Sequence, residues 1–407
     1  MATILKVARS EKELDDVFWL RHEVYVVEDG KFGGSPLPTQ RIVDRYDALP
    51  STTNIIAYDS NEPVGTIRIT RDSEVGLPPD SIFPFLELRQ IKHKEWRLET
   101  GSDSIFASAG MLAIRSNWRR RRDVLQALLK MATGVCAGWG VTHVIATSNH
   151  ETTKVYEHLG FAALAEKVWV EEYTNHIVPM FTKFSDVYQW AFGQLLDSNL
   201  DTFWLDNFAQ HFERMLFAPG ETLFSEGDLG GEAYILDSGW VAIARKDDDG
   251  RELTLATLAR GALFGELSLI DDSSRSASAV ANTHVEVIRI DKKVFQKIIN
   301  FDSPLVEKLF AVFADRIRRT DDLAMVMAFA PQTGRVEYAL NDLLKKSLPD
   351  TKVPGAKVVR IGPKDLAKSA GVREYEVRRV LEIKKFAGNL DYGEKLIRFL
   401  VQKNKAS

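Results

Sequence analysis

The sequence predicts a multidomain protein of mixed class, with an α/β part followed by α+β parts. Its 407 residues, 45% of them hydrophobic, are too many for a single core. Up to about residue 185, apolar runs alternate between strand-like and helix-like spacing, which favours an α/β layer with a mixed sheet. Short strands with glycine turns follow, then one long helical pattern and a basic, helix-rich end.

These changes of pattern predict five segments. The first is the α/β domain, and the second is a helical linker whose aromatic and leucine residues recur at helical spacing. The third is a small β-roll, because turn signals recur about every ten residues. The fourth is a long helix and the fifth a small α+β domain. In order they cover residues 1–185, 186–217, 218–300, 301–330 and 331–407.

Local spacing also predicts the elements of the first segment. Two strands, 54–58 and 63–69, flank a polar turn. Further strands are expected at 105–114, 143–147, 168–172 and 177–184, and helices at 123–138 and 151–159.

Composition disfavours several classes of protein. No apolar run approaches 18 residues and no charged–apolar–small leader is present, so neither a membrane span nor secretion is expected. The single cysteine, Cys136, cannot form an internal disulfide and suits a reducing cytoplasm. The eight histidines show no metal-ligand spacing, so no metal site is expected.

Charge is distributed unevenly along the chain. Residues 331–407 carry 17 Lys and Arg against 9 Asp and Glu, a net charge of +8, while the rest of the chain carries −12. A basic module on an acidic body indicates a polyanionic partner for that end. A basic face that only contacts solvent is the alternative.

The most informative stretch, residues 261–281, has the chemistry of an anion cradle. Free N–H groups at a helix start favour a phosphate, and Gly265 lets a ligand approach the backbone closely. Arg275 can bind a phosphate bidentately, Ser276 adds a hydroxyl, and Glu266 is an acceptor suited to a ribose hydroxyl. A glycine turn with a surface arginine is the alternative.

This stretch resembles the phosphate-binding cassette of cyclic-nucleotide-binding domains, which follows the pattern F-G-E-L-x-L-(x)n-R-S/T-A. We call residues 264–277 the cassette. The resemblance implies that a cyclic nucleotide binds there. The residues that match are Phe264, Gly265, Glu266, Leu267, Ser268, Arg275, Ser276 and Ala277.

The long helix expected at 302–330 carries a coiled-coil seam. Its members recur at alternating spacings of four and three residues: Val306, Phe310, Phe313, Ile317, Thr320, Ala324 and Met327. Such a seam predicts a partner helix and hence a homodimer, the alternative being a helix packed on its own domain.

The same helix resembles the CRP/FNR regulators, in which a Thr-Ser pair at this point reads the adenine of cyclic AMP. Thr320 is kept, whereas Asp321 replaces the serine. Cyclic AMP is therefore the expected ligand. Cyclic GMP stays open, because an aspartate could also accept from a guanine edge.

The last segment has the spacing of a helix-turn-helix. Helices are expected at 336–344, 362–369 and 373–385, with a tight turn at Gly371, and wing-like strands at 389–399. The stretch resembles the winged helix of CRP/FNR regulators, which implies binding to double-stranded DNA; a winged helix that binds protein is the alternative. The residues expected at the major groove or its phosphates are Arg373, Glu374, Tyr375, Arg378 and Arg379. Because Glu374 and Tyr375 stand where the family has Arg and Glu, a different DNA site is expected.

The first segment resembles the GNAT acyltransferase fold. The likeness is carried by residues 113–122, where a strand leads into four successive arginines, and by residues 149–161 after the fifth strand. Its front end resembles the acyl-homoserine-lactone and long-chain N-acyl amino acid synthases. The motif residues there are Arg21 and Tyr25 (R-x-x-x-F/Y), Asp44 and Asp47 (D-x-x-D), and Gly65 and Arg68 (G-x-x-R).

The resemblance implies acyl transfer from acyl-CoA or an acyl-carrier protein. The thioester arm would lie along the fourth strand, with its phosphates at the start of the next helix. Tyr156 would protonate the departing thiolate, so Tyr156 and Asn149 are the candidate catalytic residues. A packing role for Tyr156 is the alternative. The candidate donor-binding residues are Leu112, Ile114, Arg119, Arg120, Arg121 and Arg122.

Two departures bear on this activity. The glycines of the family's phosphate loop are replaced within Arg120–Leu125, and Ser108–Met111 stands where the lactone synthases carry E-x-S-R, so the glutamate base is absent. Retained acyl transfer and an inactive, ligand-sensing domain both stay open.

Together these patterns predict a dimeric, cytoplasmic, bacterial transcription regulator controlled by a cyclic nucleotide, with the GNAT-like domain as a second input or output. The alternative is a cyclic-nucleotide-gated N-acyltransferase whose basic tail is vestigial.

Overall fold

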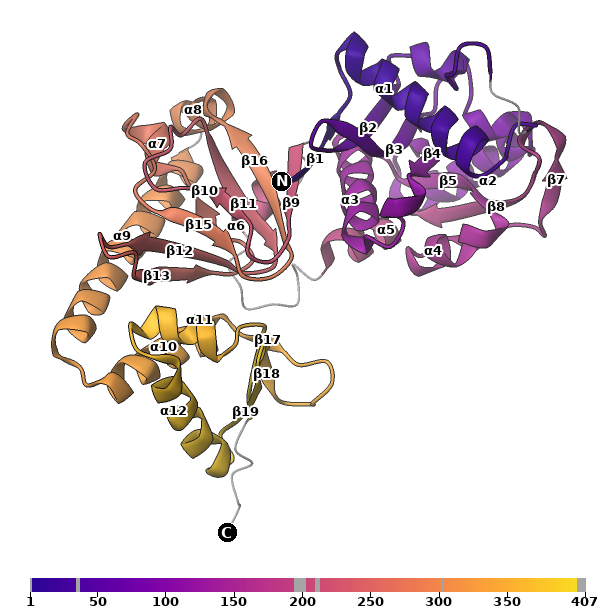
Figure 1. The fold of residues 1–407 in the computed structure, drawn as a ribbon. Helices are drawn as coiled ribbons and strands as arrows, with labels where there is room; N and C mark the ends of the chain where they lie inside the picture. The colour runs from indigo at the N-terminus through magenta and orange to yellow at the C-terminus, as the bar shows by residue number, and fades with distance from the viewer. Residues whose placement is uncertain (1, 34–36, 194–202, 209–212, 302, 401–407) are drawn as a thin grey trace. The chain divides into compact units, whose positions relative to one another are not determined.

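The computed structural model describes residues 2–33, 37–193, 203–208, 213–301 and 303–400. The chain divides into two compact units, one built mainly from residues 3–193 and the other mainly from residues 217–400 (Figure 1). None of the described helices combines the length and the apolar character that crossing a membrane requires.

A mixed sheet forms the centre of the first unit. Its strands lie in the order β9-β1-β2-β3-β4-β5-β8, and β6 and β7 both pair with β8. Among the described strands of this unit, β4 and β5 are the one pair that runs parallel. The strands are β1 (Thr3–Val7), β2 (Thr52–Asp59), β3 (Glu62–Arg71), β4 (Phe106–Ile114), β5 (His143–Asn149), β6 (Ala162–Ala163), β7 (Val168–Val170), β8 (Asn175–Lys183) and β9 (Glu213–Phe217).

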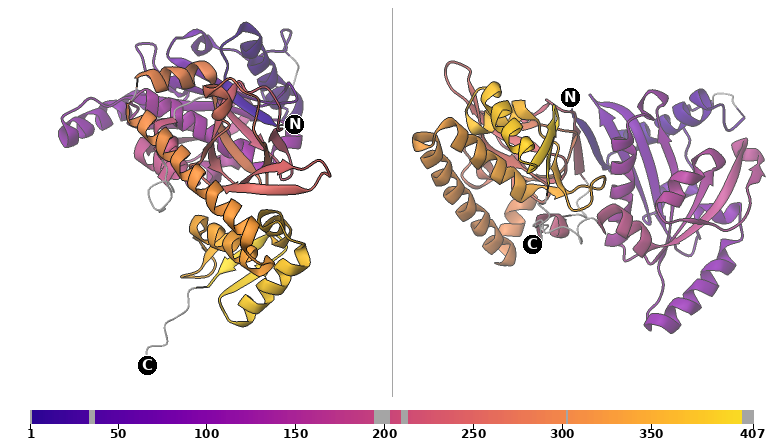
Figure 2. Two further views of the ribbon diagram at one scale, coloured as in Figure 1. Left: turned by 90° about the vertical axis from the view of Figure 1, so that its left-hand side faces the viewer. Right: turned by 90° about the horizontal axis from the view of Figure 1, so that it is seen from below.

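Helices cover both faces of this sheet, so its inner strands β2 and β3 are buried on both sides (Figure 2). On β2, Ile55 faces the core that includes α3, whereas the adjacent Ile56 packs with α1 on the opposite face. The helices are α1 (Glu11–His22), α2 (Phe85–Thr100), α3 (Arg122–Gly138), α4 (Thr153–His158) and α5 (Phe184–Phe192). A reciprocal capping box between Ser10 and Glu13 begins α1.

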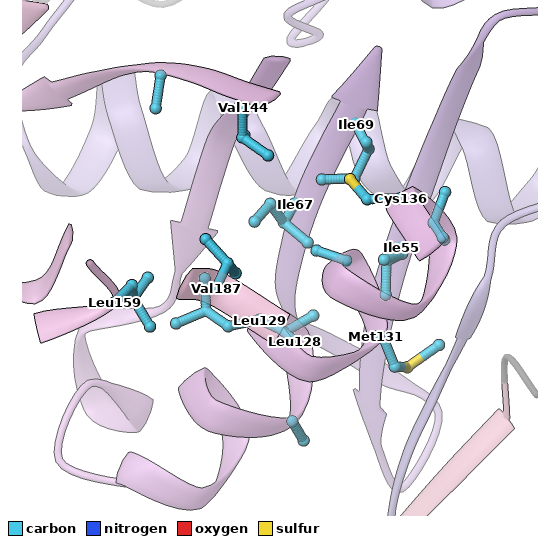
Figure 3. Close-up of a cluster of buried hydrophobic side chains, with 14 of the residues drawn as sticks. Ile55, Ile67, Ile69, Leu128, Leu129, Met131, Cys136, Val144, Leu159 and Val187 are labelled. Atoms are coloured by element: carbon cyan, nitrogen blue, oxygen red, sulfur yellow. The ribbon is translucent and has the colours of Figure 1, made fainter. Parts of the chain in front are cut away.

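The main core of the first unit lies between α3 and strands β2 and β3 (Figure 3). Leu128 and Met131 of α3 are buried against Ile55 and Ile67. A side chain at Gly65 would place its Cβ 3.0 Å from Cδ1 of Leu128, so glycine permits this close packing of helix on strand.

The predicted strands and helices of this unit are present, with two corrections. Residues 171–172 lie in a 3₁₀ turn (Glu171–Tyr173), not in a strand. The linker predicted as helical contains α5 and α6 (Phe203–Phe208) but ends in β9, which pairs with β1. The rest of the linker lies outside the described residues. The elements β1, α1, α2 and β6 were not predicted.

The second unit begins with two antiparallel sheets that form the expected roll. One has the order β14-β11-β16 and the other β10-β15-β12-β13. Their bounds are β10 (Thr222–Phe224), β11 (Glu232–Ser238), β12 (Val241–Lys246), β13 (Glu252–Leu258), β14 (Leu263–Phe264), β15 (Ser278–Ala281) and β16 (Val285–Asp291). The short α7 (Leu267–Ile270) lies between β14 and β15.

Two helices, α8 (Lys292–Phe301) and the long α9 (Ser303–Phe329), follow the roll. The apolar seam predicted on α9 is largely open in the single chain: Phe310 is 67% exposed and Ile317 62%.

The C-terminal part combines three helices with a small sheet of order β17-β18-β20-β19. Its elements are α10 (Gln332–Lys346), β17 (Leu348–Pro349), β18 (Lys357–Val359), α11 (Pro363–Ala370), α12 (Glu374–Phe386), β19 (Leu390–Gly393) and β20 (Leu396–Phe399). Leu366, Val377 and Leu381 are buried in the common core of these helices. Gly371 joins α11 to α12 with φ +59°, a conformation that glycine adopts without strain.

Candidate functional site

The cassette begins with a tight turn, which one helical turn follows. Gly265 has φ +75°, and a Cβ there would lie 2.8 Å from Nη1 of Arg275 and 3.3 Å from Cε1 of Phe224. Glycine is therefore required both for the backbone conformation and for the close approach of the arginine. α7 begins directly after Glu266.

Arg275 is buried, with 3% of its surface exposed, and it is bonded from several sides. It donates to the Gly265 carbonyl, to the Ser268 hydroxyl at 2.9 Å and to the Glu232 carbonyl at 2.7 Å. Its guanidinium also lies over the Phe224 ring, 4.2 Å from the centroid. These contacts fix the planar group in one orientation, as bidentate recognition of an anion requires.

Two buried polar atoms of the cassette have no hydrogen-bond partner among the described residues. They are Nε of Arg275 and Oε2 of Glu266. Glu266 is fully buried, and its other oxygen pairs with Arg316 of α9. Because a buried unpaired donor or acceptor costs about 1–3 kcal/mol, the cassette offers one donor and one acceptor to a bound molecule.

A cavity of about 1150 Å³ adjoins these groups. It lies between the roll and α9, where Arg316, Thr320 and Asp321 contribute to its wall. The cassette residues on the wall are Phe264, Gly265, Leu267, Ser268, Arg275, Ser276 and Ala277. The structure thus brings the predicted nucleotide-site residues together, with Glu266 buried beneath them.

The DNA-binding residues predicted at the C-terminal end lie on α12 or at its cap. Tyr375 is 59% exposed, and Arg379 pairs with Glu376 at 3.2 Å. Arg378, in contrast, is occupied: it donates to Glu374 and to Glu394 at 2.8 Å each.

In the first unit, β4 leaves its parallel partner part-way along. It pairs with β5 only as far as Ala109, and Met111 has φ +50°, a strained conformation for a residue with a side chain. The register with β3 slips at the same place. The hydroxyl of Tyr25 donates to the Leu112 carbonyl at 2.9 Å and so ties down the bulged segment. The bulge exposes backbone groups of β4 that do not pair with β5.

The four arginines after β4 are not equivalent. Arg119 donates to Asp29 at 2.8 Å and to the Ile114 carbonyl at 3.0 Å, and Arg121 donates to Asp123 at 2.7 Å. Arg120 and Arg122 are exposed and make no side-chain hydrogen bond or ion pair within the described part of the chain. Two cations of the four are therefore available to an anion.

Of the candidate catalytic residues, Tyr156 lies on α4 and Asn149 at the end of β5. Tyr156 is 5% exposed and packs edge-on against Phe161. Burial raises the pKa of Tyr156 to about 12, so the phenol keeps its proton at neutral pH. Asn149 accepts the Thr152 hydroxyl through its backbone carbonyl at 3.0 Å.

The front-end motifs converge on a buried ion network. Arg21, fully buried, donates to both carboxylate oxygens of Asp47 at 3.0 Å and to Asn54. Arg68 donates to Asp47 at 3.0 Å and to Asp44 at 2.8 Å. Burial alone would raise the pKa of Asp47, but the two guanidiniums outweigh it and hold that pKa below the ordinary value.

This network predicts a pH-dependent contribution to stability. Because the pKa of Asp47 is lower in the folded chain, its contribution is complete above the ordinary pKa of 3.8 and is lost as the pH falls through the folded value. We expect Asp47→Asn to lower the free energy of unfolding by about 3 kcal/mol near neutral pH, and this difference to shrink in acid. Denaturant titrations near neutral pH and in acid measure this difference, and Asp103→Asn, at an exposed position, is the control. An equal loss at both pH values would contradict the assignment.

The second half of the chain is similar to known proteins that bind cyclic nucleotides. The family model described as the cyclic nucleotide-binding domain matches residues 214–302. The cyclic AMP receptor protein of Thermus thermophilus is 36% identical over 171 residues, which cover 42% of this chain and 76% of that protein. The chain belongs to the cyclic AMP receptor protein family. A further member, the cAMP-activated global transcriptional regulator Vfr of Pseudomonas aeruginosa, is 31% identical over 183 residues, 44% of this chain and 85% of its own.

The N-terminal part of this chain is similar to a second family. The family model described as the N-acyl amino acid synthase FeeM matches residues 16–183. The solved structure of FeeM, from uncultured soil microbes, covers 48% of this chain and 98% of its own at 16% identity, with a TM-score of 0.38. The chain therefore joins a FeeM-like region to a cyclic AMP receptor protein region.

One residue of the candidate site was missed by sequence reasoning. Arg316 of α9 bonds both the buried Glu266 and the Leu263 carbonyl, so it joins the cassette to the long helix. Its backbone carbonyl also accepts the Thr320 hydroxyl at 2.8 Å. The sequence feature that could have indicated Arg316 is its position one helical turn before Thr320, on the side of the helix that carries the seam.

Proposed function

We propose that this protein is a dimeric, DNA-binding transcription regulator that responds to a cyclic nucleotide, with cyclic AMP as the ligand. The observation that carries the proposal is the cassette. It buries Nε of Arg275 and Oε2 of Glu266 without hydrogen-bond partners among the described residues, and it contacts the long helix through Arg316. The phosphodiester would bind Arg275, and the ribose hydroxyl would bind Glu266.

Binding of the nucleotide would also act on the long helix α9. A molecule in the cavity contacts the roll and α9 together, because both form its wall. Its differential affinity for two arrangements of α9 would supply the free energy of the switch. Cyclic AMP is proposed because relatives carry it in their names; Asp321 leaves cyclic GMP as the ligand to compare.

We assign the C-terminal part as a winged helix-turn-helix that binds double-stranded DNA. α11 and α12 with the Gly371 turn form the helix-turn-helix, α12 is the recognition helix, and β19 and β20 are the wing. The net charge of +8 on residues 331–407 supports an anionic partner. A protein with this role acts in the bacterial cytoplasm. We propose domains at residues 1–185, 218–300, 301–330 and 331–407, with residues 186–217 joining the first two.

The test is DNA binding by the purified full chain with and without ligand. Genomic fragments are selected in the presence of cyclic AMP, and the enriched duplex is then titrated in gel shifts with cyclic AMP, cyclic GMP or neither. We expect the ligand to change the affinity for the selected duplex at least tenfold, with cyclic AMP more effective. A chain that binds neither nucleotide in calorimetry, or whose DNA binding no nucleotide changes, would refute the proposal.

Acyl transfer is the second candidate function, for the GNAT-like first unit. The bulge of β4 at Met111 favours it, because the pairing of β4 with β5 ends at Ala109 and the N–H groups beyond that point would stabilise a thioester oxyanion. The protonated Tyr156 is suited to donate to a departing thiolate. The donor, acyl-CoA or an acyl-carrier protein, would lie along Leu112 and Ile114, with its phosphates near Arg120 and Arg122.

For this reaction we expect Tyr156→Phe to lower thiol release from acyl-CoA or acyl-carrier substrates about 100-fold, since general-acid catalysis contributes on that scale. Release is measured with a thiol reagent across amine acceptors, with and without cyclic AMP. The exposed Tyr188→Phe on α5 serves as control and is expected to match the unmodified chain. Thiol release that is the same in both variants would exclude Tyr156 as the acid.

A further inference from the structure

The recognition helix presents one of its arginines in an unusual setting. Arg378 bonds two carboxylates at once: its Nε donates to Glu374 at 2.8 Å, and its Nη2 donates to both oxygens of Glu394 at 2.9 and 2.8 Å. Glu374 comes from the same helix, one turn earlier. Glu394 comes from the tip of the hairpin between β19 and β20. We call these three residues the clamp.

The hairpin tip is positioned by its backbone as well as by this ion pair. A Cβ on Gly362, just before α11, would lie 1.8 Å from the Glu394 carbonyl oxygen, so the chain passes the tip in direct contact. Glycine permits this approach. The backbone of the hairpin tip is therefore held against the start of α11, and from there the 76% exposed side chain of Glu394 reaches Arg378.

The clamp changes the charge that an approaching polyanion meets. One guanidinium between two carboxylates leaves the cluster with a net charge of −1, on a module whose total is +8. A backbone phosphate can bind Arg378 bidentately only by displacing a carboxylate, because Nε and Nη2 are already occupied and both bidentate edges of a guanidinium include Nη2. The arginine is thus withheld from phosphates that do not compensate for that loss.

We propose that Glu394 is a specificity-determining residue: by holding Arg378 to the wing, it weakens binding to duplex DNA of arbitrary sequence. Non-specific affinity comes almost entirely from phosphate contacts and counterion release, so removing one cation from that contact lowers it directly. A specific complex, which also gains base contacts, is less affected. This inference rests on the proposed DNA-binding function.

The experiment measures binding of the full chain to a random-sequence duplex by fluorescence anisotropy over a range of KCl concentrations. We expect Glu394→Gln to free Arg378 for one more phosphate. The slope of log affinity against log salt should then steepen by about 0.9, and the affinity should rise about eightfold near 0.1 M salt. The affinity for the selected genomic duplex should rise less, so the ratio of specific to non-specific affinity falls.

Two further variants separate the clamp from a general change of charge. Glu382→Gln removes an equal charge from α12, but Glu382 accepts the Tyr392 hydroxyl and pairs with no arginine of the described residues, so little change of slope is expected. In an Arg378→Ala background, Glu394→Gln should lose its effect. The inference is overturned if Glu394→Gln behaves like Glu382→Gln, or if its gain persists without Arg378. Absence of binding to any duplex by any variant would instead refute the DNA-binding function itself.

Discussion

Arg275→Ala is expected to lower the affinity for cyclic nucleotide by about three orders of magnitude. The side chain offers its unpaired Nε and its buried positive charge to a phosphodiester. A hydrogen bond between charged groups contributes about 1.5–3 kcal/mol, and the attraction of two opposite charges away from water adds to it. No other cation of the cassette can take its place, because Arg275 is the one Lys or Arg in residues 264–277, all of which the structure describes. Calorimetry of the full chain with cyclic AMP and cyclic GMP measures the change.

The difficulty with this variant is that Arg275 also bonds its own domain. Its removal leaves the Ser268 hydroxyl and the Glu232 carbonyl without this donor, so some stability is lost. Arg275→Lys keeps the charge without the planar fork, and we expect it to bind nucleotide about 30-fold more weakly than the unmodified chain. Arg251→Ala, at an exposed turn of the same roll, is the control and should bind normally. A folded Arg275→Ala chain that retains affinity would remove the basis of the nucleotide site.

The cassette could be predicted from the sequence because most of its contacts are local. Gly265, Ser268 and Arg275 lie within a few turns of chain, and the residue types alone specify an anion cradle. Arg316 could not be found in this way. It comes from another element, and only the folded chain shows that it bonds the carboxylate of Glu266.

The same difference between local and long-range contacts explains which other elements could be predicted. Strands with long alternating patterns, such as β3, were predicted, whereas β1 and β9 are short and depend on each other. Thr3 pairs with Leu216 from the opposite end of the unit, and a short strand of that kind has no strong local pattern. Likewise, the motifs that contain Arg21, Asp47 and Arg68 were visible, but their joint burial was not.

Side-chain pairing also limits what composition can say about DNA binding. Arg378 and Arg379 look equivalent in sequence, and both were expected at the DNA. The structure pairs Arg378 with two carboxylates and Arg379 with one. The charge of a segment therefore gives the sign of its partner but not which cations are available to it.

The second large effect concerns the seam on α9. Phe310→Glu is expected to convert a dimer into a monomer and to lower the affinity for a two-half-site duplex by about three orders of magnitude. Phe310 is 67% exposed in the single chain, and its spacing from Phe313 and Ile317 is that of a two-stranded coiled coil. Burying a phenylalanine from each chain contributes about 2–3 kcal/mol apiece, whereas two facing carboxylates repel. A monomer contacts one half-site, so the joint contribution of the second is lost.

The helix itself supplies a matched control for this variant. Met325 is a similarly exposed apolar residue at 61%, but it lies one position beyond the seam residue Ala324, on the outer face of the helix. We expect Met325→Glu to stay dimeric and to bind DNA normally, because it makes the same chemical change away from the partner. Light scattering after size-exclusion chromatography gives the mass, and gel shifts give the affinity. Since Phe310 is not on the cavity wall, nucleotide binding should survive its replacement. A Phe310→Glu chain that remained dimeric would show that the two copies associate through another surface, and the apolar seam would then need a different occupant.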